Sequence, residues 1–178
     1  DKLTYSSDTT AVLPSGANLT TDRFYHAATG NSTAGYFGGG QGYMSRFSTD
    51  KTTYSTDTTA AVPGAAIGAR YQLAATSSST AGYFGGQTTL MDKLTYSTDT
   101  TAAVPGAALS VARSGLAATG SSAAGYFGGG GSPSGDFSTM DKVTYSSDTT
   151  AAVPGAALSV ARQYLDATGS STVGYFGG

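Results

Sequence analysis

The charged side chains of this 178-residue chain recur at fixed places, and their types could support acid–base or ion-binding chemistry. Sixteen of the twenty charged residues form four sets of four, which are Asp1, Asp50, Asp92 and Asp141; Lys2, Lys51, Lys93 and Lys142; Asp8, Asp57, Asp99 and Asp148; Arg23, Arg70, Arg113 and Arg162. Aspartates that are copies of one another are not tuned as an acid and a base, which argues against hydrolysis by paired carboxylates. We predict a scaffold role, in which Asp8 and its copies cap turns and each Arg ties neighbouring blades, the small sheets that the repeat forms, through carboxylate or carbonyl contacts.

A ring of Arg or Asp around a central channel, binding an ion, is a second interpretation of these sets. The other parts of a metal or catalytic site are scarce. His26 is the only histidine, and Leu73, Leu116 and Leu165 fill its position in the other copies. The chain has no Cys and no Glu, so zinc sites and Ser-His-Asp triads lack parts. We therefore expect no enzyme activity, no metal and no cofactor.

The charged sets belong to a unit that is repeated four times. A motif of the form DKxTYSxDTTA starts at Asp1, Asp50, Asp92 and Asp141, and GYFGG starts at Gly35, Gly82, Gly125 and Gly174. Periods of about 20 to 50 residues are typical of propellers, solenoids and arrays. We interpret residues 1–178 as a single repeat domain with units 1–49, 50–91, 92–140 and 141–178.

Each unit predicts four short strands, around LAATGS, AGYFGG, DKLTYS and TTAAVPGA, separated by turn residues. Antiparallel units of this kind are the blades of an all-β propeller, with little helix. The Tyr and Phe of GYFGG alternate along a strand and are predicted core. Three blades should be continuous, near residues 26–63, 73–105 and 116–154. The fourth would combine the strands of residues 165–178 with those of residues 1–12, which closes the ring; a larger ring or an open stacked array remains possible.

The composition excludes some partners. The net charge of −2 is unsuited to binding nucleic acid, and no apolar run approaches the roughly 18 residues of a membrane span. No segment has the pattern of a signal peptide. The chain starts with Asp1 rather than Met, which is typical of a processed product or of a piece of a longer protein. The number of copies in the natural protein therefore stays open.

The order of an Arg, a small apolar strand, a Tyr strand that ends in Gly-Gly and a second Tyr strand resembles the kelch repeat of β-propellers, shortened and without Trp. The units GYFGGG, DKxTYSxDTTAAVPGA and LSxAR are more narrowly similar to tandem kelch-like repeats in virion structural proteins of marine cyanophages. The likeness covers essentially the whole chain. It implies a virion or extracellular location.

Two segments differ strongly among the copies: the link after GYFGG and the pair of residues after each Arg. In an up-and-down blade both leave from the same end, so they share one face of the domain. Binding residues usually lie on loops that a rigid scaffold holds. The candidate contact residues on this variable face are Phe24, Tyr25, Tyr43, Arg46, Phe47, Tyr71, Phe137 and Tyr164. Unselected drift of these loops would produce the same variation.

The sequence thus favours a noncatalytic structural or adhesive module of a virion, presenting variable loops to a host-surface glycan or protein or to other virion proteins. A secreted, lectin-like or protein-binding propeller is one alternative, which glycan binding by a soluble monomer would indicate. An open repeat array that forms an extracellular fibre is another, which length-dependent assembly would indicate. Homo-oligomers are compatible with each interpretation.

Overall fold

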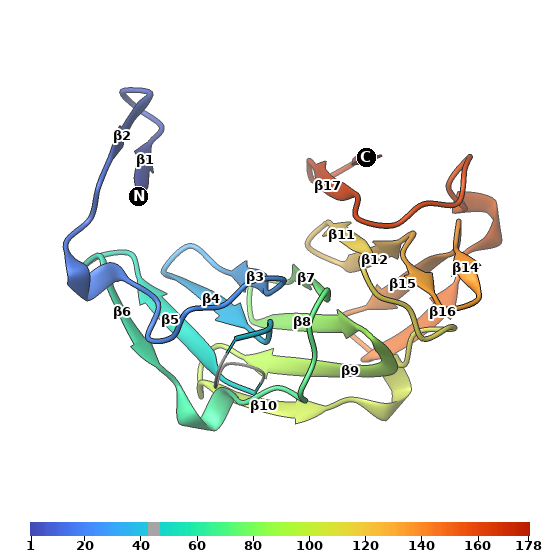
Figure 1. The fold of residues 1–178 in the computed structure, drawn as a ribbon, viewed down its shortest axis with the longest axis horizontal. Helices are drawn as coiled ribbons and strands as arrows, with labels where there is room; N and C mark the ends of the chain where they lie inside the picture. The colour runs from blue at the N-terminus through green and yellow to red at the C-terminus, as the bar shows by residue number, and fades with distance from the viewer. Residues whose placement is uncertain (43–46) are drawn as a thin grey trace.

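The computed structural model describes residues 1–42 and 47–178, and its main elements are three four-stranded antiparallel sheets (Figure 1). The first blade consists of β3 (Ala27–Gly30), β4 (Ala34–Gly38), β5 (Thr49–Thr53) and β6 (Thr58–Ala61). The second blade consists of β7 (Ala74–Ser77), β8 (Ala81–Gly86), β9 (Thr88–Thr95) and β10 (Thr100–Ala103). The third blade consists of β11 (Ala117–Gly120), β12 (Ala124–Gly128), β15 (Met140–Thr144) and β16 (Thr149–Ala152). The predicted strands and the three continuous four-stranded units are confirmed as antiparallel sheets, and blade is used below as a name for each of these sheets.

Two hairpins lie at the ends of the row of blades. β1 (Lys2–Thr4) pairs with β2 (Thr9–Ala11), and β17 (Asp166–Gly169) pairs with β18 (Gly174–Gly177). A further small hairpin, β13 (Gly131–Ser132) with β14 (Gly135–Asp136), extends from the third blade. Figure 1 shows the blades as an arc with the two terminal hairpins at opposite ends. Within the described residues these hairpins are separate sheets, so the shared fourth blade is not assembled in this structure.

Local sequence explains the turns within the blades. Asp57, Asp99 and Asp148 adopt φ values of 51°, 52° and 52° in the turns that join the third and fourth strands. Asp tolerates this left-handed region better than most residues, because its short polar side chain can bond locally. After each fourth strand the chain makes a 3₁₀ turn, at η1 (Ser15–Ala17), η2 (Pro63–Ala65), η3 (Pro105–Ala107) and η4 (Pro154–Ala156). Pro fixes φ and lacks an N–H, so the predicted strand TTAAVPGA ends before it.

The register between the second and third strands is the same in all three blades. In the second blade Tyr83 lies opposite Lys93, and Phe84 lies opposite Asp92. Residues directly opposite each other share a face of the sheet, whereas successive residues face opposite ways. Each blade therefore directs Tyr and Lys toward the following blade, and Phe toward the preceding one.

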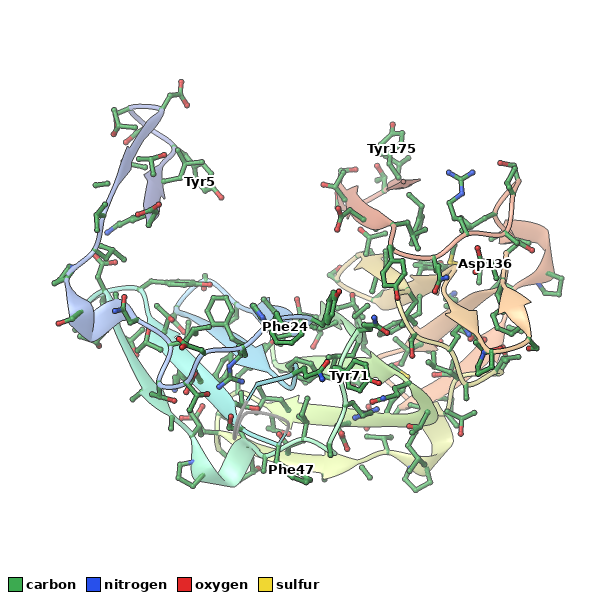
Figure 2. The ribbon with its side chains drawn as sticks, viewed as in Figure 1. Tyr5, Phe24, Phe47, Tyr71, Asp136 and Tyr175 are labelled. Atoms are coloured by element: carbon green, nitrogen blue, oxygen red, sulfur yellow. The ribbon has the colours of Figure 1, made fainter. Side chains whose placement is uncertain are left out.

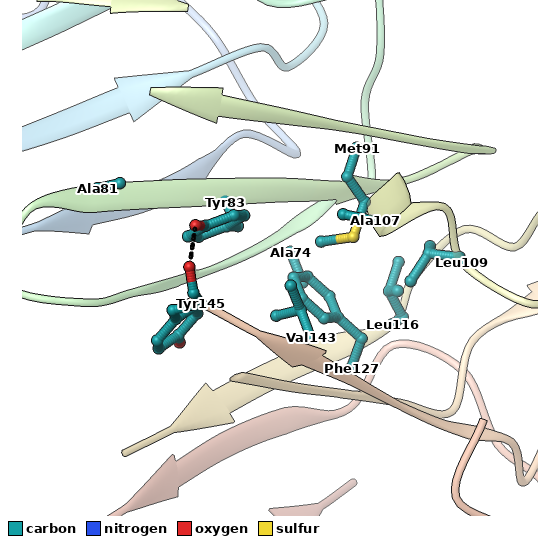
Figure 3. Close-up of a cluster of buried hydrophobic side chains, with 10 residues drawn as sticks. All are labelled: Ala74, Ala81, Tyr83, Met91, Ala107, Leu109, Leu116, Phe127, Val143 and Tyr145. Atoms are coloured by element: carbon teal, nitrogen blue, oxygen red, sulfur yellow. Dashed lines mark hydrogen bonds between the residues drawn. The ribbon is translucent and has the colours of Figure 1, made fainter. Parts of the chain in front are cut away.

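The core lies between blades. Tyr36, Leu73, Phe84 and Leu94 pack in the cluster between the first and second blades. The cluster between the second and third blades contains Tyr83, Met91, Leu116, Phe127 and Val143, with small alanines between them (Figure 3). The predicted core role of the GYFGG aromatics is thus confirmed where a blade has neighbours on both sides.

At the end of the arc the same position is open. Tyr175, the counterpart of Tyr83, is 66% exposed, whereas Tyr83 is 1% exposed. The difference follows from the missing neighbour and not from the local sequence, because GYFGG is identical in the two units. Within the residues that the structure describes, no helix has the length and apolar character to cross a membrane.

Candidate functional site

The repeated Arg and Asp residues form buried ion pairs that hold the scaffold. Arg113 Nη1 lies 2.7 Å from Asp141 Oδ2, and both side chains are fully buried. The same guanidinium donates to the carbonyl groups of Phe127 and Gly129 at 3.0 and 2.6 Å. Arg23 and Arg70 pair in the same way with Asp50 and Asp92. Each pair fixes the segment that enters a blade to the third strand of the same blade. The arginines thus hold the scaffold, but the expectation that each of them ties neighbouring blades is corrected, because the bonds lie within one blade.

The second set of aspartates joins neighbouring blades. Asp148 of the third blade accepts hydrogen bonds from Lys93 Nζ at 2.7 and 2.9 Å and from the Tyr83 hydroxyl at 2.5 Å. Asp99 receives the equivalent bonds from Lys51 and Tyr36 of the first blade. These carboxylates occupy the predicted turns, but they bond to the preceding blade. The sequence expectation that they cap their own turns is corrected accordingly.

The protonation states of these groups suit a structural role. Burial raises the pKa of the Asp99 and Asp148 carboxyls, but the hydrogen bonds from Lys and Tyr outweigh it and hold both pKa values below the ordinary one. Burial and the bond to Asp99 raise the pKa of Tyr36 to about 12. Near neutral pH the carboxylates are therefore ionised and Tyr36 is a donor. Across residues 1–42 and 47–178, no three His or Asp side chains gather as a metal site.

A chain of three backbone hydrogen bonds links the four units along the inner side of the arc. Tyr25, Gln72, Gly115 and Tyr164 occupy the same position in the four units, two residues after the repeated Arg, and have φ values between 54° and 64°. The N–H of Gln72 donates to the carbonyl of Tyr25 at 2.9 Å. Gly115 donates to Gln72, and Tyr164 donates to Gly115, each at 2.8 Å. The left-handed backbone thus aligns four side-chain positions around one centre.

These four positions open into one pocket, which we call the axial pocket. Its volume is about 260 Å³, and it is lined by Tyr25, His26, Gln72, Leu73, Gly115, Leu116, Tyr164, Leu165 and Asp166. All four units contribute the axial residue and the residue that follows it. The pocket is therefore a single site that needs every unit, although the outer parts of the arc are open.

Different side chains at one repeated position make the axial pocket asymmetric. Gln72 Nε2 donates to the hydroxyl of Tyr164 at 2.9 Å, which links the second unit to the fourth across the axis. Gly115 leaves room for Tyr164, because a Cβ at this residue would lie 3.2 Å from the tyrosine ring. Tyr25 packs edge-on against Phe24 with 5.1 Å between the ring centroids. The four equivalent axial positions thus hold two tyrosines, one glutamine and one glycine.

The buried layer of the pocket contains one polar exception. Leu73, Leu116 and Leu165 are 5–6% exposed and occupy equivalent positions. His26 takes the fourth position, where its Nδ1 atom is buried and has no hydrogen-bond partner in the described part of the chain. Burial and the nearby charge of Arg23 lower the pKa of His26, so the imidazole is neutral at pH 7.

The structure brings some of the predicted contact residues together. Tyr25 and Tyr164 line the axial pocket, and Phe24 supports Tyr25. Tyr71 lies beside the pocket residue Gln72, and its N–H donates to the side chain of Gln87 at 3.2 Å. Figure 2 draws Phe24 and Tyr71 near the inner side of the arc and Phe47 at its outer side.

The other predicted contact residues are not part of the pocket. Phe47 is 59% exposed, and its carbonyl accepts a bond from Ile67. Phe137 is partly buried and bonds through its backbone to Gly130 and Arg162. Tyr43 and Arg46 lie outside the described residues.

The two variable segments are neighbours, as the prediction of one shared face requires. Phe24 and Gln41 form a two-way backbone bridge, and Ser114 and Gly131 form the equivalent bridge in the third unit. Each bridge joins the residue after an Arg to the link that follows GYFGG. The bridges thus place Gln41 and Gly131, near the start of two of the variable links, beside the residues that precede the axial positions.

Sequence reasoning missed Gln72, His26 and Asp166 as pocket residues. Gln72 belongs to the variable pair after Arg70, so the variation between copies marks its position, but it is not one of the aromatic residues that were predicted to make contacts. The replacement of a repeated leucine by His26 is the clearest signal in the sequence that this position differs from its copies. Asp166 stands where the other copies have alanine at residues 27, 74 and 117.

Comparison with known proteins gives no family for this chain. No model of a protein family matches it, and no curated protein matches it.

Proposed function

We propose that this chain is a noncatalytic binding module, in which a repeated β scaffold presents non-repeated side chains around its axis. The observation that carries the proposal is the axial pocket, because the residues that support it repeat while the axial residues are Tyr, Gln, Gly and Tyr. Variation confined to loops on a rigid framework is the usual arrangement of a recognition surface. The buried ion pairs and the interblade bonds account for most repeated charges as scaffold.

We further propose that the module lies on a virion and contacts a host-cell glycan or protein or a neighbouring virion protein. The support is the similarity of its repeat units to those of cyanophage virion proteins. Many copies on one particle would convert weak individual contacts into strong adhesion. A secreted lectin-like propeller uses the same pocket without the particle and is the second candidate, which the mixed aromatic and polar lining favours.

Beads coated with many copies of the chain test the adhesive function. We expect saturable attachment to cells within a panel of marine cyanobacteria, or to phage particles that lack the module. Beads that carry Tyr25→Ser together with Tyr164→Ser should lose most of this attachment, because both rings that border the axial pocket are removed. The control is Leu90→Ser, which changes an exposed apolar residue on β9 away from the pocket. Attachment that the double variant retains in full, or no attachment to any tested surface, contradicts the proposal.

We also propose that the arc closes into a four-bladed propeller of kelch-like blades, with β1–β2 and β17–β18 forming the fourth blade. A pocket of about 380 Å³ between the third blade and β17–β18 supports this architecture. Its lining includes Thr119, Tyr126, Met140, Leu158 and Phe176. Their counterparts between the second and third blades are packed around two further side chains of the third blade, Val143 and Tyr145.

The N-terminal hairpin carries the side chains that this pocket lacks. Leu3 and Tyr5 are the counterparts of Val143 and Tyr145, and they are 53% and 86% exposed. Lys2 already makes the repeated bond to the following blade, since its Nζ lies 2.7 Å from Asp57. The N-terminal hairpin is thus bonded to the first blade, on one side of the gap. Closing the gap would bury Leu3 and Tyr5 against the third blade.

An engineered disulfide tests this closure, because the chain has no cysteine of its own. The register Ala34↔Thr53 in the first blade, with its equivalents in the other two, predicts that Val173 lies opposite Thr4. Directly opposed residues have the separation that a disulfide requires. We expect Thr4→Cys with Val173→Cys to form an intramolecular disulfide on mild oxidation, and the mismatched pair Thr9→Cys with Val173→Cys to remain reduced. Disulfide-linked dimers of the matched pair, or equal oxidation of both pairs, would refute closure within one chain.

A further inference from the structure

The shape and lining of the axial pocket restrict the class of ligand. Its volume of about 260 Å³ lies just below the range of roughly 300–1,000 Å³ that drug-sized ligands occupy, which suits a single six-membered ring. No lining residue is cationic, and the one charged lining residue is Asp166. A phosphate, sulfate or carboxylate ligand would meet no positive partner in the lining and would face the Asp166 carboxylate. The ligand class is therefore neutral or cationic.

The two kinds of side chain in the pocket indicate an amphipathic ligand. Leu73, Leu116 and Leu165 form an apolar layer, and Tyr25 and Tyr164 expose about half of their surfaces beside it. Gln72, Asp166 and His26 add amide, carboxylate and imidazole groups around this layer. A purely apolar ligand would leave these polar groups without partners, which is costly when they are covered.

His26 is the polar exception in the leucine layer of the pocket. Three units show that leucine satisfies the scaffold at this position, so packing does not demand a histidine. The Nδ1 atom is buried and has no partner in the described part of the chain. Because that nitrogen is covered by the protein, a ligand in the pocket does not reach it, and the hydrogen bonds to a ligand are left to Gln72 and Asp166.

We propose that the axial pocket binds one neutral pyranose ring, with its C–H face against Tyr164 and its hydroxyls on Gln72 and Asp166. This inference rests on the proposed binding function and names the ligand class of the same pocket. A pyranose combines an apolar face with a rim of hydroxyls, which matches tyrosine rings next to an amide and a carboxylate. Tyr164 is preset for stacking, because Gly115 gives its ring room and Gln72 holds its hydroxyl.

Titration of the whole chain with the methyl glycosides of glucose, galactose, mannose and N-acetylglucosamine tests the proposal, using saturation-transfer NMR. We expect saturable binding of at least one glycoside, with the strongest transfer to ring C–H protons. Tyr164→Ala should weaken that binding at least about tenfold, because the stacking face is lost. Asp166→Ala should weaken it several-fold without lowering the melting temperature, since the scaffold accepts alanine in the other units. Phe47→Ala, at the outer side of the arc, is the matched control and should bind normally.

Two results would overturn this inference. One is the absence of saturable binding by all four glycosides, and the other is equal binding by the wild-type chain, Tyr164→Ala and Asp166→Ala. Attachment of wild-type beads to cells or particles, combined with no glycoside binding, would overturn the sugar ligand and leave the module's adhesive function standing. Glycoside binding without attachment of the beads would refute the virion role and support the lectin-like candidate.

Discussion

Replacing Arg113 with Met lowers the free energy of unfolding by about 3–5 kcal/mol, the usual cost of removing one partner from a buried ion pair. The guanidinium is fully buried and bonds to Asp141 and to the carbonyls of Phe127 and Gly129. Met fills a similar volume but leaves the Asp141 carboxylate buried without its cation. Urea denaturation of the two proteins measures the difference.

A double-mutant cycle separates the charge effect from packing. Asp141→Leu alone should also be strongly destabilising, because it leaves Arg113 unpaired. The double variant Arg113→Met with Asp141→Leu should be far more stable than the sum of the single losses predicts, since no buried charge remains. Asp22→Ala changes an exposed carboxylate and should shift stability by less than about 0.5 kcal/mol. Additive losses in the cycle would mean that the two side chains contribute independently.

The strand content of this protein follows from features visible in its sequence. The motifs DKxTYSxDTTA and GYFGG recur in the same order in every unit. A strand assignment made for one unit therefore applies to all four. Small residues next to Tyr and Phe, with Asp at the turns, leave few alternatives to short antiparallel strands. The three continuous blades could therefore be predicted closely, and the resemblance to kelch repeats was not needed for them.

The candidate site was predicted only in part, because its geometry depends on a left-handed backbone conformation that the residue types at these positions do not predict. Tyr25, Gln72 and Tyr164 are ordinary L-residues in the left-handed region, held there by hydrogen bonds between successive units. The sequence showed that these positions vary but not that they converge on one axis. The positions of Phe47 and Phe137 also differ between the copies, but these residues lie outside the axial pocket. Variation between copies therefore identifies loops and does not show which loops line the axis.

The hydrogen-bond partners of the charged residues also could not be predicted from the sequence. Asp148 lies in a turn, and a turn aspartate normally suggests a local cap. Its bonds to Lys93 and Tyr83 arise because the opposed Tyr and Lys of one blade reach the turn of the next. That contact depends on how the blades stack. Repeat position alone could not distinguish a local cap from a bond between blades.

Phe127→Ala should cost about 3–5 kcal/mol, because the ring is fully buried in the core between the second and third blades. The ring packs among Ala74, Leu116 and Met91, which fixed strands hold and which cannot collapse fully into the space left behind (Figure 3). The loss should appear as a lower urea midpoint with an unchanged slope. A loss below about 1 kcal/mol would mean that the blades do not pack as the structure describes.

The same substitution in the first blade tests whether the arc closes. Phe37 is the counterpart of Phe127, but it is only partly buried, since it faces the gap where the fourth blade would stand. In an open arc, Phe37→Ala removes less buried surface and should cost about half as much as Phe127→Ala, because the cost follows the area withdrawn from water. In a closed ring Phe37 would be covered by the C-terminal hairpin, and the two losses should become equal. We expect equality; a clearly smaller loss at Phe37 would show that the first blade stays uncovered in solution.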